Sequence, residues 1–250
     1  YVMKTEPISV KDNDPIEEVA EKIEKYDLVA LPVVDSIGRL VGRITIDDVI
    51  DEIREQHERD YQLASGISQD IEASDKVYMQ TAARLPWLLI GMAGGLANSI
   101  LLGGFDSLFA ANPKMALFIP LIGGTGGNVG IQSSAIVVQG LANNSLKQAK
   151  LWSLIAKEVV VALINASIIS LVVFLFNYFF LGDVLVMSAV SISLFSVVLF
   201  ASIFGTMVPM LLDRLKIDPA IATGPFITIT NDLIGMMIYM LVATLLAQAL

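Results

Sequence analysis

The chain has 250 residues, of which 55% are hydrophobic and 16% charged, and its mean hydropathy is +0.69. Soluble globular proteins usually carry about 25% charged residues, so this composition excludes a wholly soluble protein. Residues 1–80 hold 9 basic and 19 acidic residues (net −10), whereas the rest of the chain holds 7 and 6 (net +1). The acidity argues against nucleic acid as a partner, and the absence of cysteine excludes disulfides and thiolate metal sites. The sequence therefore predicts an acidic soluble segment joined to a membrane segment.

The soluble segment begins with alternating strand and helix signals. Asp14-Pro15 predicts a helix start, because proline is favoured at the first helical position. The predicted order is a strand at 7–10, a helix at 16–25, strands at 31–35 and 40–45, and a second helix from Asp47.

Three short motifs in this segment point to a known module. They are Pro-Val-Val-Asp ending at Asp35, Gly-x-Leu-x-Gly from Gly38 and Thr-x-x-Asp from Thr45 to Asp48. Residues 1–53 thereby resemble a cystathionine-beta-synthase (CBS) module. The resemblance implies that Asp48 contacts an adenine nucleotide in an intact pair of modules. Because such modules work in tandem, we expect residues 1–53 to be the second of a pair, and the chain to be part of a longer protein.

The helix predicted from Asp47 is strongly acidic and continues toward Asp75. Its carboxylates at Asp48, Asp51, Glu55 and Glu58 are spaced 3, 4 and 3 apart and so line one face. Like charges at this spacing destabilise a helix by a few tenths of a kcal/mol per pair, and a divalent cation would relieve the repulsion. We expect an acidic connecting helix over residues 54–80; the alternative interpretation of the charges is a solvated helix face.

Five apolar stretches follow residue 80, and each reaches the roughly 20 residues that a helix needs to cross a bilayer. They cover residues 85–102, 115–139, 151–181, 184–212 and 222–249. On the side of residues 1–80 would lie Lys76, Arg84, Lys147, Lys150, Lys157, Arg214 and Lys216, and on the other side Lys114. The positive-inside rule therefore predicts a multi-pass protein of the cell (inner or plasma) membrane, with the N-terminal segment cytoplasmic and the C-terminus outside.

Asp232 lies well inside the fifth apolar stretch. An unpaired carboxylate in hydrocarbon costs at least about 2.5 kcal/mol, so such a residue normally faces a polar cavity, a partner or an ion. The 4, 3, 4 spacing of Thr228, Asp232, Gly235 and Tyr239 predicts one helix face, which we interpret as a pore wall. The alternative is a protonated Asp232 that is hydrogen-bonded within the helix bundle.

The second apolar stretch contains five glycines within residues 123–130. Close packing of helices is one explanation, because small residues four apart let backbones approach. Polar residues favour another: Gly124, Asn128, Gln132 and Gln139 form a stripe that lipid would not tolerate. Carbonyl and carboxamide oxygens on such a stripe are suitable partners for a hydrated ion.

The available ligands indicate which ion would be bound. Hard oxygen ligands without Cys or His suit Mg²⁺, Ca²⁺ or Mn²⁺ better than zinc or copper. Mg²⁺ retains several waters and is typically held by one or two carboxylates, so one aspartate per chain, doubled by a twofold axis, fits Mg²⁺ best. The residues leave the choice between Mg²⁺ and Mn²⁺ open.

Together these features resemble the MgtE family of magnesium channels. The resemblance rests on the CBS module, the acidic helix, five membrane helices, Gly-Gly-Thr-Gly-Gly-Asn-x-Gly-x-Gln from Gly123 and Asn-Asp-x-x-Gly from Asn231. It implies a homodimer whose pore lies on the twofold axis, a connecting helix that plugs this pore, and Asp232 as the residue that binds hydrated Mg²⁺. The expected pore-lining residues are Gly124, Gly127, Asn128, Gln132, Thr228, Asn231 and Gly235. The expected cytosolic Mg²⁺ ligands are Asp48, Asp51, Glu55, Glu58 and Asp60.

The expected fold is thus a mostly α membrane protein: a partial α/β CBS module (1–53), an acidic connecting or plug helix (54–80) and a transmembrane domain of five helices (81–250). The expected function is Mg²⁺ entry into the cytoplasm, closed by cytosolic Mg²⁺ on the acidic helix and CBS region. Alternatives are a broader transporter of Mn²⁺ or Co²⁺, a cation-coupled carrier, and a non-conducting CBS-type membrane sensor. An enzyme is not expected, because no Ser/His, His/Glu or paired-Asp constellation is present.

Overall fold

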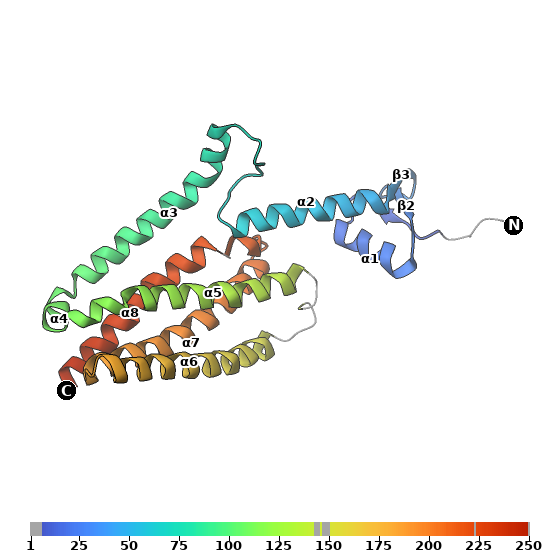
Figure 1. Ribbon diagram of the computed structural model, residues 1–250. Helices are drawn as coiled ribbons and strands as arrows, with labels where there is room; N and C mark the ends of the chain where they lie inside the picture. The colour runs from blue at the N-terminus through green and yellow to red at the C-terminus, as the bar shows by residue number, and fades with distance from the viewer. Residues whose placement is uncertain (1–6, 143–145, 147–150, 223, 250) are drawn as a thin grey trace. The chain divides into compact units, whose positions relative to one another are not determined.

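The computed structural model describes residues 7–142, 146, 151–222 and 224–249. Its contacts divide the chain into two units, Tyr1–Tyr61 and Gln62–Leu250, and each is described by itself (Figure 1). Lys147 and Lys150, two of the charges predicted to be cytoplasmic, lie outside the described residues.

The first unit contains a small sheet of order β1-β2-β3. Strand β1 (Val10–Lys11) pairs in parallel with β2 (Ala30–Val34), and β2 pairs antiparallel with β3 (Leu40–Thr45). Helix α1 (Ile16–Tyr26) makes the crossover that a parallel pair requires. The order of elements predicted for this segment is confirmed, although β1 begins only at Val10.

A small apolar core holds this sheet against its helices. Its buried members come from β1, β2, α1 and the first turn of the following helix, and they are Val10, Val19, Ile23, Leu31 and Val49. The turn between β2 and β3 is closed by Asp35, whose Oδ1 accepts backbone hydrogen bonds from Ile37 and Arg39 at 3.1 and 2.8 Å. Gly38 occupies the positive φ (83°) that this turn needs.

The acidic helix α2 covers Ile46–Ala64 and is shorter than predicted. Residues 65–76 are not helical, so the expectation of one helix through residue 80 is wrong for this segment, and residues 77–80 belong to α3 (Val77–Gly103). The helix ends where Gly66 adopts a positive φ of 77°. Side chains then order the connection: Gln62 bonds both backbone groups of Ile71, and the Ser68 hydroxyl donates to the Ala83 carbonyl at 2.8 Å.

The second unit is helical throughout its described elements. They are α3 (Val77–Gly103), α4 (Asp106–Ala111), η1 (Pro113–Phe118), α5 (Ile119–Ala142), α6 (Leu151–Phe180), α7 (Val184–Arg214), η2 (Pro219–Ala222) and α8 (Pro225–Ala249). The expectation of a mostly helical protein with a small N-terminal sheet is confirmed.

Helix α7 is the centre of this bundle. It packs against α5, α6 and α8, while α5 also packs against α8, and α3 packs against α8. Figure 1 shows α5, α6, α7 and α8 running side by side. The core lies between α5, α7, α8 and η1, and there the Tyr239 hydroxyl donates to the Met115 carbonyl at 2.9 Å.

Four described helices are long and apolar enough to cross a membrane: Val77–Gly103, Trp152–Phe180, Val184–Arg214 and Pro225–Ala249. Helix α5 has 24 residues but is not among them. Its glycines, serines and carboxamides lower its hydropathy, and one face is covered by α7 and α8 instead of lipid. The structure therefore supports four spans on composition, and the fifth span stays a prediction.

Candidate cation site

Asp232 lines a cavity of about 290 Å³ between α3, α5 and α8. From α8 the cavity receives Thr228, Asp232 and Met236, which lie one turn apart on one face. From α3 it receives Asn98. Helix α5 supplies the opposite wall, with Ile119, Pro120, Gly123, Gly124, Gly127, Asn128 and Ile131.

The glycines of α5 let the Asp232 carboxylate lie close to the helix backbone. A Cβ atom added to Gly123 would lie 3.4 Å from Asp232 Oδ1, and one added to Gly127 would lie 3.6 Å from the same oxygen. Side chains larger than methyl at either position would occupy the space beside the carboxylate. The glycine run therefore keeps the approach to Asp232 open on the α5 side.

The structure brings most of the predicted pore-lining residues to this cavity. Gly124, Gly127, Asn128 and Thr228 line it together with Asp232. Gln132 lies on the exposed face of α5 that also carries Gly124 and Asn128, beyond the residues that line the cavity.

Two predicted pore-lining residues, and Tyr239 from the predicted helix face, lie instead in the bundle interior. Gly235 is buried against Val197, and Asn231 is 1% exposed with its amide against Gly130. Tyr239 belongs to the core, where η1 covers the continuation of the Asp232 face. The predicted 4-3-4 face of α8 is therefore divided between the cavity and the core.

Six of the cavity residues were not predicted to line a pore: Asn98, Ile119, Pro120, Gly123, Ile131 and Met236. Asn98 carries the clearest signal, because it is the one carboxamide within the Val77–Gly103 span that follows Gln80. Its Oδ1 is buried and has no hydrogen-bond partner among the described residues. A buried polar atom without a partner calls for an explanation, and here its residue lines the same cavity as Asp232.

A larger cavity of about 920 Å³ shares Asp232 and Thr228 with the first. It is bounded by α3, by the first turns of α8 and by residues 64–67 at the end of α2. There the Ala64 carbonyl contacts Gly224, and a Cβ atom added to Gly66 would lie 2.7 Å from Pro225 Cγ. Asp232 thus lines two cavities, one of which is also lined by residues 64–67 at the end of the acidic helix.

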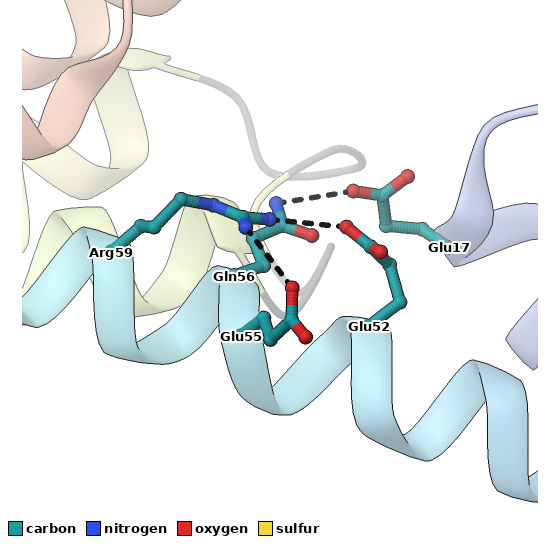
Figure 2. A network of polar contacts seen from close by, with 5 residues as sticks. All are labelled: Glu17, Glu52, Glu55, Gln56 and Arg59. Atoms are coloured by element: carbon teal, nitrogen blue, oxygen red, sulfur yellow. Dashed lines mark hydrogen bonds and ion pairs between the residues drawn. The ribbon is translucent and has the colours of Figure 1, made fainter. Parts of the chain in front are cut away.

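Three carboxylates of α2, those of Glu52, Glu55 and Glu58, form ion pairs with arginines. Arg59 contacts Glu52 at 3.0 Å and Glu55 at 3.5 Å, as Figure 2 shows, and Arg54 contacts Glu58 at 3.2 Å. In the same view Gln56 donates to Glu17 of α1 at 3.4 Å. Such exposed ion pairs contribute about 0–1 kcal/mol each, so a divalent cation could displace them.

Asp48 begins α2 and has a structural partner. Its carboxylate accepts hydrogen bonds from the Thr45 hydroxyl and from the Thr45 backbone N–H at 2.9 Å, in the manner of a capping box. These hydrogen bonds with Thr45 lower the pKa of Asp48 below its usual value. The Thr-x-x-Asp motif therefore explains the helix start by itself.

The predicted cytosolic ligands do not form a complete metal site within the described part of the chain. No group of three or more His, Asp or Glu side chains is placed there to hold a metal ion. Asp51 is exposed on the same helix, and Asp60 makes a further contact. The roles of Asp48, Asp51, Glu55, Glu58 and Asp60 in metal binding stay predictions.

Comparison with known proteins relates this architecture to a family. Residues 119–242 match the family model of the MgtE divalent cation transporters, and residues 1–55 match the CBS domain. The chain is 33% identical over 249 residues to the magnesium transporter MgtE of Bacillus subtilis, covering 100% of this chain and 55% of that protein. It is 34% identical over 254 residues to the magnesium transporter MgtE of Thermus thermophilus, covering 99% and 55%. It is 33% identical over 244 residues to that of Enterococcus faecalis, covering 98% and 54%. The chain spans about half the length of these relatives.

Proposed function

Because the chain belongs to the MgtE family of divalent cation transporters, as a multi-pass membrane protein with a CBS module, we propose that it conducts Mg²⁺ into the cytoplasm past Asp232. The observation that carries the proposal is the position of Asp232, which lines a cavity beside Gly123 and Gly127 of α5. A membrane carboxylate in such a cavity is expected to meet an ion or its water shell. In this proposal two copies of the chain form a homodimer in the lipid bilayer, with the ion path on the twofold axis.

The size of the cavity supports passage of a hydrated ion. Six waters, the number in the octahedral shell of Mg²⁺, occupy about 180 Å³ at liquid density. The cavity at Asp232 measures about 290 Å³ and offers polar atoms of Asn98, Asn128 and Thr228. Mg²⁺ gives up its bound waters reluctantly. One carboxylate per chain, with further oxygens that contact the bound waters, therefore suits this ion.

The end of α2 provides a physical basis for gating. Ala64 and Gly66 pack on Gly224 and Pro225 at the start of α8, the helix that carries Asp232. In the proposed mechanism cytosolic Mg²⁺ binds the carboxylates of α2 and the CBS region and holds this contact closed. When Mg²⁺ falls, repulsion among these carboxylates favours separation and opening. An adenine nucleotide at an intact pair of CBS modules would act on the same equilibrium.

The proposal is tested by Mg²⁺ uptake into proteoliposomes loaded with a fluorescent Mg²⁺ indicator. We expect Asp232→Asn to lower uptake by at least about tenfold, because an amide does not supply the charge that faces a divalent cation. The matched control is Asp218→Asn, which changes an acid outside the helices. Equal uptake by wild type and Asp232→Asn, with both proteins folded, would favour a non-conducting CBS-type membrane sensor.

The description of the matched family as divalent cation transporters favours one second candidate, a broader specificity. Competition decides it: Mn²⁺ or Co²⁺ at equal concentration should leave Mg²⁺ uptake almost unchanged if the path selects Mg²⁺. Inhibition by both ions, with their own uptake also lost in Asp232→Asn, would establish the broader transporter.

A further inference from the structure

Glu158 joins three helices through one carboxylate oxygen. Its Oε1 accepts hydrogen bonds from the Ser133 hydroxyl on α5 at 2.6 Å and from the Ser202 hydroxyl on α7 at 2.9 Å. The two hydroxyl oxygens lie 3.2 Å apart, and the serines are 6% and 2% exposed. These residues do not line the cavity at Asp232.

Each polar group of this cluster would cost free energy in the bundle without the other two. Glu158 lies within the apolar span Trp152–Phe180, where an isolated carboxylate is costly. Buried hydroxyls likewise cost free energy when they lack a hydrogen-bond partner. With both serines donating to the same oxygen, the carboxylate and the two hydroxyls satisfy one another. Helix α6 thereby becomes bonded to the pair α5 and α7.

The cluster lies next to the closest approach of α5 and α7. One helical turn away, the carbonyl oxygen of Gly130 contacts Gly205, with no side chain between the two backbones. Gly130 and Ser133 are three residues apart on α5, as are Gly205 and Ser202 on α7. Two adjacent contacts therefore fix how far α5 is displaced along α7. Because Gly127 is six residues from Ser133, about 9 Å along the helix, the same contacts set the wall that faces Asp232.

We propose that Glu158 is a positioning residue for ion transport: by accepting both serine hydroxyls it holds α5 in the position that places Gly123 and Gly127 beside Asp232. This inference rests on the proposed function. Its action requires an acceptor oxygen and does not require a charge. Glutamine has the same length and retains a carbonyl oxygen with two lone pairs, so it can accept from both serines.

The experiment compares Glu158→Ala, Glu158→Gln and the wild type in the proteoliposome uptake assay, over a range of external Mg²⁺ concentrations. We expect Glu158→Ala to raise the half-saturating Mg²⁺ concentration by about tenfold, the loss typical of hydrogen bonds to a charged group. Glu158→Gln should return it to within about threefold of wild type, because the bonds that remain are to a neutral acceptor. Thermal midpoints measured in detergent ensure that only folded protein is compared.

Single serine variants keep the test valid if Glu158→Ala does not fold. Ser133→Ala and Ser202→Ala each remove one of the two hydrogen bonds and should each raise the half-saturating concentration. Ser167→Ala is the matched control, since that exposed hydroxyl on α6 donates to the Leu163 carbonyl of its own helix. It should leave uptake unchanged.

Two results would overturn the positioning role. Wild-type uptake in Glu158→Ala would show that the tether is dispensable, and equal loss in Glu158→Ala and Glu158→Gln would show that the charge itself is needed. Both results are distinct from failure of the proposed function, in which the wild type conducts no Mg²⁺ or Asp232→Asn conducts normally.

Discussion

The environment of Asp232 depends on the residues that α5 places opposite it. Gly123 and Gly127 have no side chains, and Asp232 Oδ1 lies at ordinary van der Waals distance from where their Cβ atoms would be. The carboxylate consequently has open space instead of packed hydrocarbon beside it. The sequence identified Asp232 by its charge, its helix-face spacing and the Asn-Asp-x-x-Gly motif, whereas the contact with these glycines depends on how α5 and α8 pack.

Asp48 is the residue for which the structure predicts a pH effect. Its pKa is lowered in the folded state by hydrogen bonds from Thr45, so its stabilising contribution is present above the unfolded pKa of about 3.9. That contribution is lost as the pH falls through the lower, folded-state pKa. We therefore expect Asp48→Asn to be less stable than wild type at pH 6 and to lose less stability between pH 6 and pH 3. The thermal midpoint followed by circular dichroism measures both.

Asp51→Asn is the control for this prediction. Asp51 lies one turn further along α2 and accepts none of the hydrogen bonds that start the helix. Between pH 6 and pH 3 the thermal midpoint of Asp51→Asn should fall by as much as that of wild type. An identical response of the Asp48 and Asp51 variants would contradict the role of Asp48 at the start of the helix.

At the scale of elements, the glycines of α5 serve two different faces. Gly123 and Gly127 face Asp232, whereas Gly130 lies against Gly205 of α7 and the Asn231 amide of α8. The sequence analysis weighed helix packing against a pore wall as alternative explanations of the glycine run. The structure assigns residues to both, because successive positions of a helix point in different directions.

The contact between α5 and α7 predicts a large effect at Gly205. A Cβ atom at this position would overlap the Gly130 carbonyl oxygen, a backbone atom that cannot move without displacing α5. We expect Gly205→Ala to lower the free energy of unfolding by about 1–3 kcal/mol, the usual cost of overpacking. The thermal midpoint in detergent gives the measurement.

Gly95→Ala provides the comparison within the same bundle. A Cβ atom there meets no atom within 4 Å, and alanine favours a helix over glycine by about 0.5–1 kcal/mol. The variant should be as stable as wild type or slightly more stable. Equal thermal midpoints for Gly205→Ala and Gly95→Ala would show that α5 and α7 separate more easily than their contact indicates.

At the scale of the whole molecule, the polar face of α5 is the feature that a single chain leaves uncovered. Gly124, Asn128, Gln132 and Gln139 are exposed, although their helix lies among apolar spans. Lipid would not satisfy the carboxamides of this face. A second copy of the chain across a water-filled path would, which is how the proposed homodimer accounts for the polar stripe.

Crosslinking tests this arrangement directly, since residues 1–250 contain no cysteine. We expect Asn128→Cys to form covalent dimers in membranes with a short bifunctional thiol reagent, because the proposed twofold axis near Asp232 would bring the two copies of α5 together. Ile168→Cys, at an exposed position on α6, should remain monomeric. Dimers from Ile168→Cys but not from Asn128→Cys would place the contact between copies elsewhere.

Much of the fold could be predicted from local sequence patterns. The Asp-Pro pair, the Gly-x-Leu-x-Gly motif from Gly38 and the apolar runs are local signals that led to the correct order of elements, because propensity and hydropathy act over a few residues. The helix continuing past Ala64 was predicted wrongly, since charge continues along that segment while the backbone turns at Gly66. The apparent span at 115–139 was likewise divided into η1 and α5.

For this protein the sequence alone determined that an acidic CBS-like segment precedes a membrane domain with one acid deep in its last helix. The reason is that the content and spacing of apolar and charged residues determine whether a segment is stable in water or in lipid. Only the tertiary structure decided that Asp232 shares its cavity with Asn98, Gly123 and Met236, and that Asn231 and Gly235 face the interior. It also decided that Glu158 bonds serines of two other helices. These outcomes depend on how the helices are displaced and rotated against one another, and close contacts between residues far apart in the chain set that geometry.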